Sequence, residues 1–356
     1  MKKRLLYIIL CALTVLLLQN PAGSVFYAKK GLKLCESVII PSLFPFFVCS
    51  GLLVYSGFCE VLARLLQPVM RPLFGVSGAG AAAFVLGLVS GYPLGAVTAC
   101  QLYEKSYLTK TETERLLAFC NNSGPLFILG AVGISLYASP KIGVLLYLSH
   151  ILASLLAGVM FRFYRRGSFT PVVSLPQTEE KPFGEVYANV MSQSVQSILL
   201  VSGTVIFAST AANLAADLFF SDSAFRLFFV SLAEFTSGIS NLSETELPLL
   251  QKLVLSSGIV GFAGLSVHLQ VLGVVARYHL NLFPYFFGKL LHAVFSMLFT
   301  LILLRISPAD TPVFQSFSAS LSGGFCISSL YTTLAVLFLA LAALLALMVR
   351  TVKNMT

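Results

Sequence analysis

The stretch Phe119–Gly133 reads FCNNSGPLFILGAVG, and the rest of the chain is best interpreted outward from it. Two adjacent Asn residues, a Ser, a Gly and a Pro come first, and an apolar run follows. In a water-soluble protein this would be a turn leading into a buried segment. Within a membrane, polar backbone that breaks a helix is tolerated only where protein covers it or where it lines a cavity. In a membrane protein, these residues are therefore expected to form one wall of a substrate site.

The composition places this stretch in a membrane protein. The chain has 356 residues, of which 57% are hydrophobic and only 10% are charged. A soluble domain of this size would lack the polar residues needed to cover its surface. Apolar runs long enough to cross a lipid bilayer recur from end to end, which predicts an all-α polytopic membrane protein. The net charge of +9 comes mostly from Lys and Arg at segment ends, which fits membrane anchoring better than nucleic-acid binding.

The sequence shows no motif for catalysis, metal binding or ATP hydrolysis. Its seven Cys are scattered without a CxxC pair, and its four His lack the spacing of metal ligands. No GxSxG, Walker or GxGxxG motif occurs. We therefore expect neither an enzyme nor an ATP-driven pump, and no cofactor or metal.

Apolar segments and charged connections divide the chain into five parts. In chain order these are an N-terminal transmembrane helix (1–32), a first half (33–166), an aqueous linker (167–185), a second half (186–305) and a C-terminal loop and transmembrane helix (306–356). The first part contains the apolar run Leu5–Leu18 after a basic start, for which a cleaved signal peptide is the alternative. The linker is rich in Pro and Glu, and the last helix is expected over Ile327–Val349.

The two halves repeat one order of segments: a span, a broken apolar helix, a short charged helix, a second broken apolar segment and a final span. Three breaks are expected at Ser90–Gly95, at Asn121–Pro125 and around Thr236–Gly238. A fourth broken segment is expected from Ser256–Gly258 through Gly264, Ser266, His268 and Gln270. The charged helices are expected within Tyr103–Leu117, with a capped start at a Thr, and at Ser243–Leu250. Paired interrupted segments are typical of secondary transporters built from repeats, and we expect the two halves to be inverted repeats. The alternative is that Gly and Pro here only produce kinks and tight packing.

Candidate site residues come from these breaks. The substrate-binding candidates are Ser90, Gly91, Tyr92, Pro93, Asn121, Asn122, Ser123, Gly124, Glu234, Thr236, Ser237, Ser256, Ser257, Ser266 and His268. Half-helix starts at Asn121–Gly124 and Ser256–Gly258 would offer free N–H groups to a polar or charged solute. For His268, a hydrogen bond between helices is an equal alternative.

Two charged residues in apolar segments receive different interpretations. Glu234 lies in a run that looks embedded in the membrane, where an ionisable side chain costs about 3 kcal/mol. We expect it to be a proton carrier, a cation ligand or half of an ion pair. Lys289 lies near a segment end and is expected to be an interfacial anchor.

Several motifs resemble those of a known family. SGYPLGA (Ser90–Ala96), YEKSYLTKTETERLLAFCNNSGPLFILGAVG (Tyr103–Gly133), LAEFTSGI (Leu232–Ile239) and GFAGLSVHLQV (Gly261–Val271) are similar to the sporulation integral membrane protein YlbJ (SpoVV) family. The resemblance runs over about Lys33 to Arg305. It implies two nucleoside-recognition (Gate) domains similar to halves of concentrative nucleoside transporters. It also implies a protein of the outer forespore membrane that passes dipicolinic acid toward the forespore.

This implied substrate raises a question of charge. Dipicolinate is a flat aromatic dianion, and a bare Glu234 beside it would repel it. Glu234 must therefore be protonated, paired with a cation or placed away from the ligand. Coupling to a proton or a sodium ion is the hypothesis that this clash suggests. A transporter of nucleosides or other small solutes, and a non-transporting structural protein of the spore envelope, are the alternatives. A homo-oligomer is compatible with each of these functions.

Overall fold

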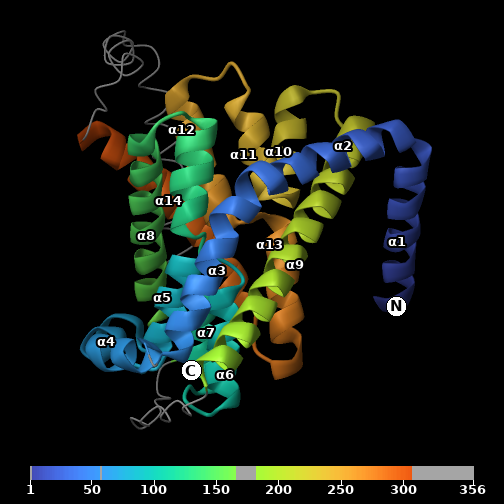
Figure 1. Cartoon of the computed structure of the whole chain (residues 1–356). Coiled ribbons are helices and arrows are strands. Elements are labelled where there is room, and N and C mark those ends of the chain that lie inside the picture. The colour runs from blue at the N-terminus through green and yellow to red at the C-terminus, as the bar shows by residue number, and fades with distance from the viewer. Residues whose placement is uncertain (1, 57, 166–181, 307–356) are drawn as a thin grey trace.

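The computed structural model describes residues 2–56, 58–165 and 182–306, which are largely helical and include no β-strand (Figure 1). Four helical runs in this part of the chain are long and apolar enough to cross a membrane: α8 (Pro140–Phe161), α9 (Phe183–Phe219), the α12–α13 run (Leu249–Tyr278) and α14 (Phe283–Ile306). The predicted all-α polytopic membrane fold is confirmed. Most of the expected linker and the expected C-terminal helix lie outside the described residues, and the five-part division stays a prediction.

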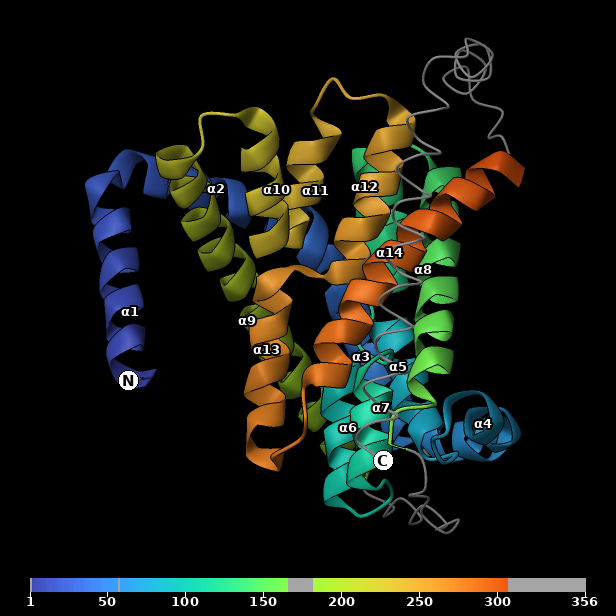
Figure 2. The same ribbon diagram turned by 180° about the vertical axis from the view of Figure 1, so that it is seen from behind.

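The N-terminal helices wrap around the outside of the bundle. Helix α1 (Lys2–Gln19) lies at its edge (Figures 1 and 2). The chain then bends by 101° into α2 (Pro21–Leu34), and the pair would make a fifth crossing if it is one broken span. Asn20 caps α2 by accepting a hydrogen bond from the Gly23 amide at 2.8 Å, and Pro21 suits the first helical position.

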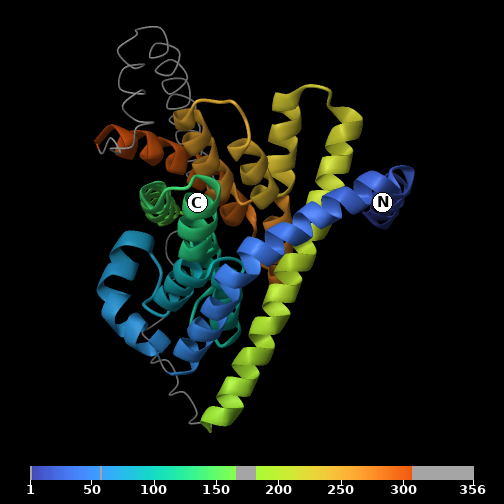
Figure 3. The ribbon, with the colours of Figure 1, turned by 45° about the horizontal axis from the view of Figure 1, so that its top comes forward.

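Helix α2 continues through a short π-helical segment, η1 (Cys35–Ile39), into α3 (Ile40–Tyr55), and this run crosses α9 (Figure 3). Cys35, Ile39 and Phe47 pack against apolar side chains of α9 to form a small core. At 1.5 Å per residue α9 is about 55 Å long, well beyond the roughly 30 Å hydrocarbon core. Such a helix fits a bilayer by tilting, and α9 runs obliquely through the molecule (Figure 3).

Helix α4 (Phe58–Phe74) lies across one end of the bundle (Figure 1). Val61, Leu65 and Val69 repeat every fourth residue and are exposed, whereas Met70 and Phe74 are buried. A helix lying flat with an exposed apolar stripe suits the membrane interface.

The first hairpin consists of α5 (Gly80–Ser90) and α6 (Leu94–Glu104), with the predicted break between them. Gly87 and Gly95 face each other across the hairpin, and the carbonyl oxygen of Cys120 lies between them. A Cβ atom would lie 1.7 Å from this oxygen at Gly87 and 2.0 Å at Gly95. Because only glycine leaves room for that carbonyl, these two positions hold the hairpin against the polar break that follows α7.

The second hairpin consists of α10 (Ser223–Ala233) and α11 (Phe235–Ser243). The predicted break at Thr236–Gly238 is wrong by a few residues. The chain breaks at Glu234, which has extended backbone angles and caps α11, so that Thr236–Gly238 form the first turn of that helix. A carboxylate accepts hydrogen bonds from the free N–H groups of a helix start, which explains the position of the break.

Each hairpin is followed by a helix that is interrupted. Helix α7 (Lys110–Leu117) leads into the polar break Cys120–Gly124 and then into the π-helical segment η2 (Leu126–Leu136), as predicted. Helix α12 (Leu249–Phe262) is separated from α13 (Gly264–Val275) by Ala263, which has φ +76°, and Gly264 has φ +71°.

The fourth broken segment is therefore confirmed at Gly264, but the half-helix start predicted at Ser256–Gly258 is wrong, because α12 passes through these residues without interruption. Gly258 serves another purpose. It lies against Met297 of α14, and a Cβ atom there would be 2.8 Å from the methionine sulfur. A glycine inside a helix often permits close helix packing, and it marks a break only where the backbone angles change.

The second charged helix, predicted over Ser243–Leu250, is also wrong. The chain from Glu244 to Pro248 connects α11 to α12 without helical structure. The Thr245 hydroxyl donates to the Leu242 carbonyl at 2.7 Å and closes the end of α11. Pro248 precedes the first residue of α12, where its missing N–H does no harm.

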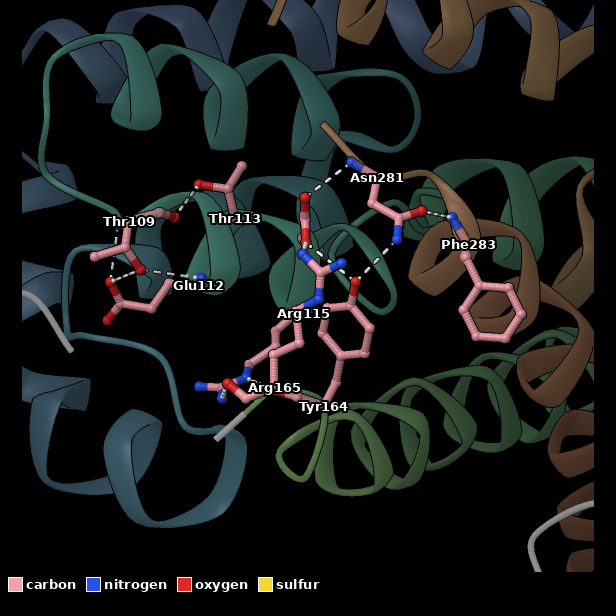
Figure 4. Close-up of polar contacts among 9 residues, drawn as sticks. Thr109, Glu112, Thr113, Arg115, Tyr164, Arg165, Asn281 and Phe283 are labelled. Carbon is pink, nitrogen blue, oxygen red and sulfur yellow. Dashed lines mark hydrogen bonds and ion pairs between the residues drawn. The ribbon is translucent and has the colours of Figure 1, made fainter. Parts of the chain in front are cut away.

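The first charged helix, α7, begins as predicted but is not a solvated surface. Thr109 caps it and forms a capping box with Glu112 (Figure 4). Arg115, which packs beside Tyr164 and Arg165 (Figure 4), is 1% exposed. It donates three hydrogen bonds to backbone carbonyls, those of Gly75 at 2.6 Å, Tyr164 at 2.8 Å and Arg165 at 2.7 Å. The guanidinium thus satisfies carbonyl groups just beyond the end of α8.

Glu114 beside it connects the two halves of the chain. Its carboxylate accepts hydrogen bonds from the backbone N–H of Asn281 at 2.8 Å and the Tyr164 hydroxyl at 3.2 Å, and it pairs with Arg165 at 3.5 Å. Asn281 lies in the connection before α14, and its side chain donates to Tyr164 (Figure 4). Burial and then the Glu114 charge raise the pKa of Tyr164, which keeps this phenol neutral.

One order of elements recurs in the two halves. A hairpin, an interrupted helix and a long helix follow one another as α5–α6, α7–η2 and α8, and again as α10–α11, α12–α13 and α14. Helices α8 and α14 pack side by side and antiparallel, with Phe161 near Phe287 at one end and His150 near His292 farther along (Figure 2). That the second set is inverted relative to the first stays a prediction.

Candidate functional site

The tips of both hairpins meet both helix breaks at one place. The first tip touches the first break, since a Cβ atom on Gly91 would lie 2.9 Å from the Gly124 nitrogen. The second tip touches the second break, since a Cβ atom on Gly264 would lie 3.0 Å from the Phe235 nitrogen. Tyr92 joins the two, with its ring edge-on to Phe235 at 5.5 Å between centroids. The breaks of the two halves therefore form one centre.

The polar break after α7 supplies unpaired polar groups to this centre. The Asn122 amide nitrogen donates to the Phe119 carbonyl at 2.8 Å, which caps the end of α7, and the Ser123 N–H donates to Nε2 of His150 at 3.1 Å. The Asn122 oxygen and the hydroxyl of Ser90 are buried without a hydrogen-bond partner among the described residues. Since buried polar atoms are normally paired, these atoms point to a polar ligand or water.

Lys289 is the residue that the sequence interpretation missed. It lies less than two turns into α14, is 1% exposed, and donates to the Asn121 carbonyl at 2.9 Å. Its ammonium also lies 5.5 Å from the centroid of the Tyr92 ring, where a cation is attracted by the aromatic face. No carboxylate in the described part of the chain forms an ion pair with it.

The prediction that Lys289 is an interfacial anchor is therefore wrong. Helix α14 packs against α7, α8 and α12, so a side chain on its inner face is enclosed before it can reach the lipid headgroups. The signal was present in the sequence, because an ionisable residue well inside an apolar helix is a candidate site residue by the reasoning applied to Glu234.

Glu234 is fully buried, but its oxygens are occupied by its own hairpin. They accept hydrogen bonds from the Thr236 N–H at 3.1 Å, the Thr236 hydroxyl at 2.6 Å and the Ser237 N–H at 2.7 Å. The Ser237 hydroxyl in turn donates to Ser209 of α9 at 2.8 Å. The carboxylate is thus stabilised by the start of α11, where a negative charge is favourable.

The remaining candidates have mostly helix-to-helix contacts. Ser256 shares a hydrogen bond of 2.8 Å with Tyr137, and the Ser257 hydroxyl donates to Val254 of its own helix. His268 shares one of 2.8 Å with Tyr285, while its Nε2 atom is buried without a partner in the described residues. Ser266 is buried in the first turn of α13. Pro93 lies in the tip and is the N-cap residue of α6.

A pair of histidines whose rings are in contact adjoins the centre and was not predicted. The rings of His150 on α8 and His292 on α14 have centroids 4.2 Å apart. Nε2 of His292 lies 3.0 Å from the His150 carbonyl. On α14, His292 comes one turn after Lys289, so the pair lies directly beside the buried ammonium.

Comparison with known proteins places this arrangement in a family. The nucleoside-recognition (Gate) family matches residues 37–161, which include the first hairpin and the Asn121–Gly124 break. The sporulation integral membrane protein YlbJ of Bacillus subtilis (strain 168) is 32% identical over 328 residues, covering 82% of this chain and 80% of that protein. The chain belongs to the YlbJ family of sporulation integral membrane proteins.

This membership confirms the resemblance seen in the motifs. The YlbJ-family alignment covers most of the chain, and the Gate match lies within the predicted first half, 33–166. The protein is an integral membrane protein of this family. No solved structure matches the chain.

Proposed function

We propose that this YlbJ-family protein is a secondary transporter of a small organic anion, with dipicolinate as its substrate, in the outer membrane around the forespore. The observation that carries the proposal is the buried ammonium of Lys289 at the meeting point of the four breaks, without a carboxylate partner in the described residues. Family membership supports a role in sporulation.

The charge of Lys289 favours an anion over a neutral nucleoside. A buried charge is costly unless an opposite charge or several hydrogen bonds compensate it. Lys289 can donate three hydrogen bonds, and one of them reaches the Asn121 carbonyl. A carboxylate ligand would supply both an acceptor and the missing negative charge. The start of η2 just beyond Pro125 adds N–H groups that favour an anion in the same region.

The contacts between the hairpin tips suit a moving part. Tyr92 and Phe235 meet edge to face, and Phe127 meets Phe235 at 5.2 Å. Aromatic contacts of this kind can separate without leaving a backbone group unpaired. One long polar contact, from the Tyr92 hydroxyl to the Val260 carbonyl at 3.4 Å, joins the first tip to α12. Motion of the tips relative to the breaks would open the centre to one face at a time.

The proposal is tested by uptake into liposomes that contain the purified protein. Labelled dipicolinate should enter, and unlabelled pyridine dicarboxylates should compete while uridine and adenosine should not. Asn122→Ala should lower uptake at least tenfold, because it removes an unpaired oxygen of the centre. Asn213→Ala is the matched control, since that buried amide donates to the Ser209 carbonyl within its own helix.

Two results would overturn the proposal. Competition by nucleosides but not dicarboxylates would favour a nucleoside transporter. Absence of any solute flux from well-folded protein, together with normal sporulation of the Asn122→Ala strain, would favour a structural role in the spore envelope.

A further inference from the structure

The inner face of α14 carries a row of polar side chains that the proposed anion site does not use in full. Lys289, His292, Ser296 and Thr300 follow one another at spacings of three, four and four residues, which places them on one face of a helix. Each is at most 1% exposed. The row rises about 16 Å along the helix, roughly half the thickness of the hydrocarbon core. It therefore connects the centre with the membrane face at which α14 ends.

The hydrogen bonds of the histidine pair fix the positions of its protons. His150 accepts at Nε2 from the Ser123 N–H, so in its neutral form the ring carries its proton on Nδ1. His292 places Nε2 against the His150 carbonyl, which can only accept, so its proton is on Nε2. Both Nδ1 atoms are buried without a partner in the described residues. The pair thus presents one free N–H group, on His150, and one free lone pair, on His292.

The two hydroxyl groups farther along the row are also unpaired. Ser296 Oγ and Thr300 Oγ1 are buried without a hydrogen-bond partner in the part of the chain that the structure describes. A helical Ser or Thr commonly donates to the carbonyl four residues earlier, as Ser149 does on α8 at 2.9 Å. Ser296 and Thr300 do not. Buried hydroxyl groups left free in this way are normally paired with water, and a file of such groups can pass a proton.

The titratable groups that face the histidine pair come from three elements. Lys289 is on the same helix as His292, and His150 faces His292 from α8. Cys120, in the break after α7, faces Lys289. No carboxylate among the described residues forms a hydrogen bond or an ion pair with either imidazole ring. With an empty site, the Lys289 charge therefore opposes a second positive charge beside it.

A bound dianion would reverse this balance. Two carboxylates bring two negative charges, of which Lys289 neutralises one. We propose that one proton enters along the α14 row, binds the free Nδ1 of His292, and travels with the dianion, so that the loaded centre is electrically neutral. The inference rests on the proposed anion transport and names its coupling ion. It assigns the proton to the histidine pair, whereas Glu234 serves as a helix cap.

The direction of the row also indicates from which face of the molecule the proton enters. Thr300 lies near the C-terminal end of α14, and this end lies at the same face of the molecule as the connection between α11 and α12 (Figures 1 and 2). The opposite face carries α4 and the turn after α6 (Figure 1). A proton from the α11–α12 side would meet Thr300, then Ser296, then His292.

The test uses liposomes containing the full-length protein and the pH-sensitive dye pyranine in the lumen. Entry of dipicolinate should acidify the lumen by one proton per molecule, whereas picolinate, a monoanion, should enter without a proton. Thr300→Val and Ser296→Ala should reduce proton-driven accumulation at least tenfold. Exchange of labelled for unlabelled dipicolinate should stay within twofold of the wild type, because exchange moves no net proton.

Matched controls remove similar hydroxyl groups that are bonded to their own helices. These are Thr210→Val, whose hydroxyl donates to Ile206 at 2.7 Å, and Ser149→Ala. Both should behave as the wild type in both assays. If Thr300→Val and Ser296→Ala match these controls, or if dipicolinate enters without acidifying the lumen, the inference is overturned while the proposed function stands.

A second measurement reads the site without any flux. If the wild type exchanges no dipicolinate, the proposed function fails. In that case, ¹⁵N spectra of labelled histidines still test the proposed proton path, because they show which ring nitrogen carries the proton. The expected tautomers carry the proton on Nδ1 of His150 and on Nε2 of His292, with both Nδ1 positions in contact with water. Other tautomers, or Nδ1 atoms shielded from water, would refute the path.

Discussion

Lys289→Met offers the sharpest test of the proposed centre, because the two effects expected of it have opposite signs. Methionine fills a similar volume and removes the charge. If Lys289 binds a carboxylate, the variant should bind dipicolinate more weakly. If its charge lacks a counter-charge in the empty protein, as the described contacts indicate, the variant should also be more stable without ligand.

The size of each effect follows from the burial of the ammonium. Two unit charges about 4 Å apart attract by roughly 4 kcal/mol at the effective dielectric constant of about 20 that describes such sites. Allowing for desolvation, we expect the variant to lose about 3 kcal/mol of binding free energy, which raises the dissociation constant of dipicolinate about 100-fold. Replacing a buried, uncompensated charge by an apolar side chain should stabilise the empty protein by about 1–4 kcal/mol.

The assay combines thermal unfolding in detergent with a titration of dipicolinate. Wild-type protein should gain stability as ligand is added, since a ligand that binds only the folded state raises the unfolding midpoint. Lys289→Met should start from a higher midpoint and gain little. Lys252→Met is the control, because Lys252 also donates to a backbone carbonyl, that of Ser243 at 2.9 Å, but is half-exposed at the start of α12.

A single outcome would refute this reasoning. If Lys289→Met is less stable than the wild type and binds dipicolinate with unchanged affinity, the ammonium is a structural donor to the Asn121 carbonyl. Lys289 would then not bind the anion, and the proposed site would contain no positively charged ligand group.

Two further predictions concern the backbone of the centre. Gly87→Ala should lower the free energy of unfolding by about 3 kcal/mol and reduce the yield of monodisperse protein, because its Cβ would lie 1.7 Å from the Cys120 oxygen. Gly273→Ala is the control, since a Cβ there would have no atom within 4 Å. Equal yields of the two variants would contradict the packing described for Gly87. Glu234→Gln keeps one acceptor oxygen for the Thr236 N–H and should cost about 1 kcal/mol in stability while proton-driven uptake persists. If well-folded Glu234→Gln protein loses proton coupling, the proton carrier is the Glu234 carboxylate and not the histidine pair.

Much of the fold was predictable because its signals are local. The capping box of Thr109 and Glu112 is contained in four consecutive residues, and the start of α7 follows from it. The break at Gly91–Pro93 likewise follows from residues that cannot continue a helix. Where the chemistry is ambiguous, as for Gly258, the sequence predicts a break and the structure shows close packing against α14.

The sequence alone determined that this chain is an α-helical membrane protein with polar breaks, because composition and helix-breaking residues act over short distances. Only the tertiary structure decided which groups share the centre. Whether Lys289 reaches lipid headgroups or lies enclosed depends on three other helices that pack over it. The same holds for the pairing of His150 with His292, which lie 142 residues apart in the chain. Which buried groups contact one another is a property of the packed bundle, and no local pattern encodes it.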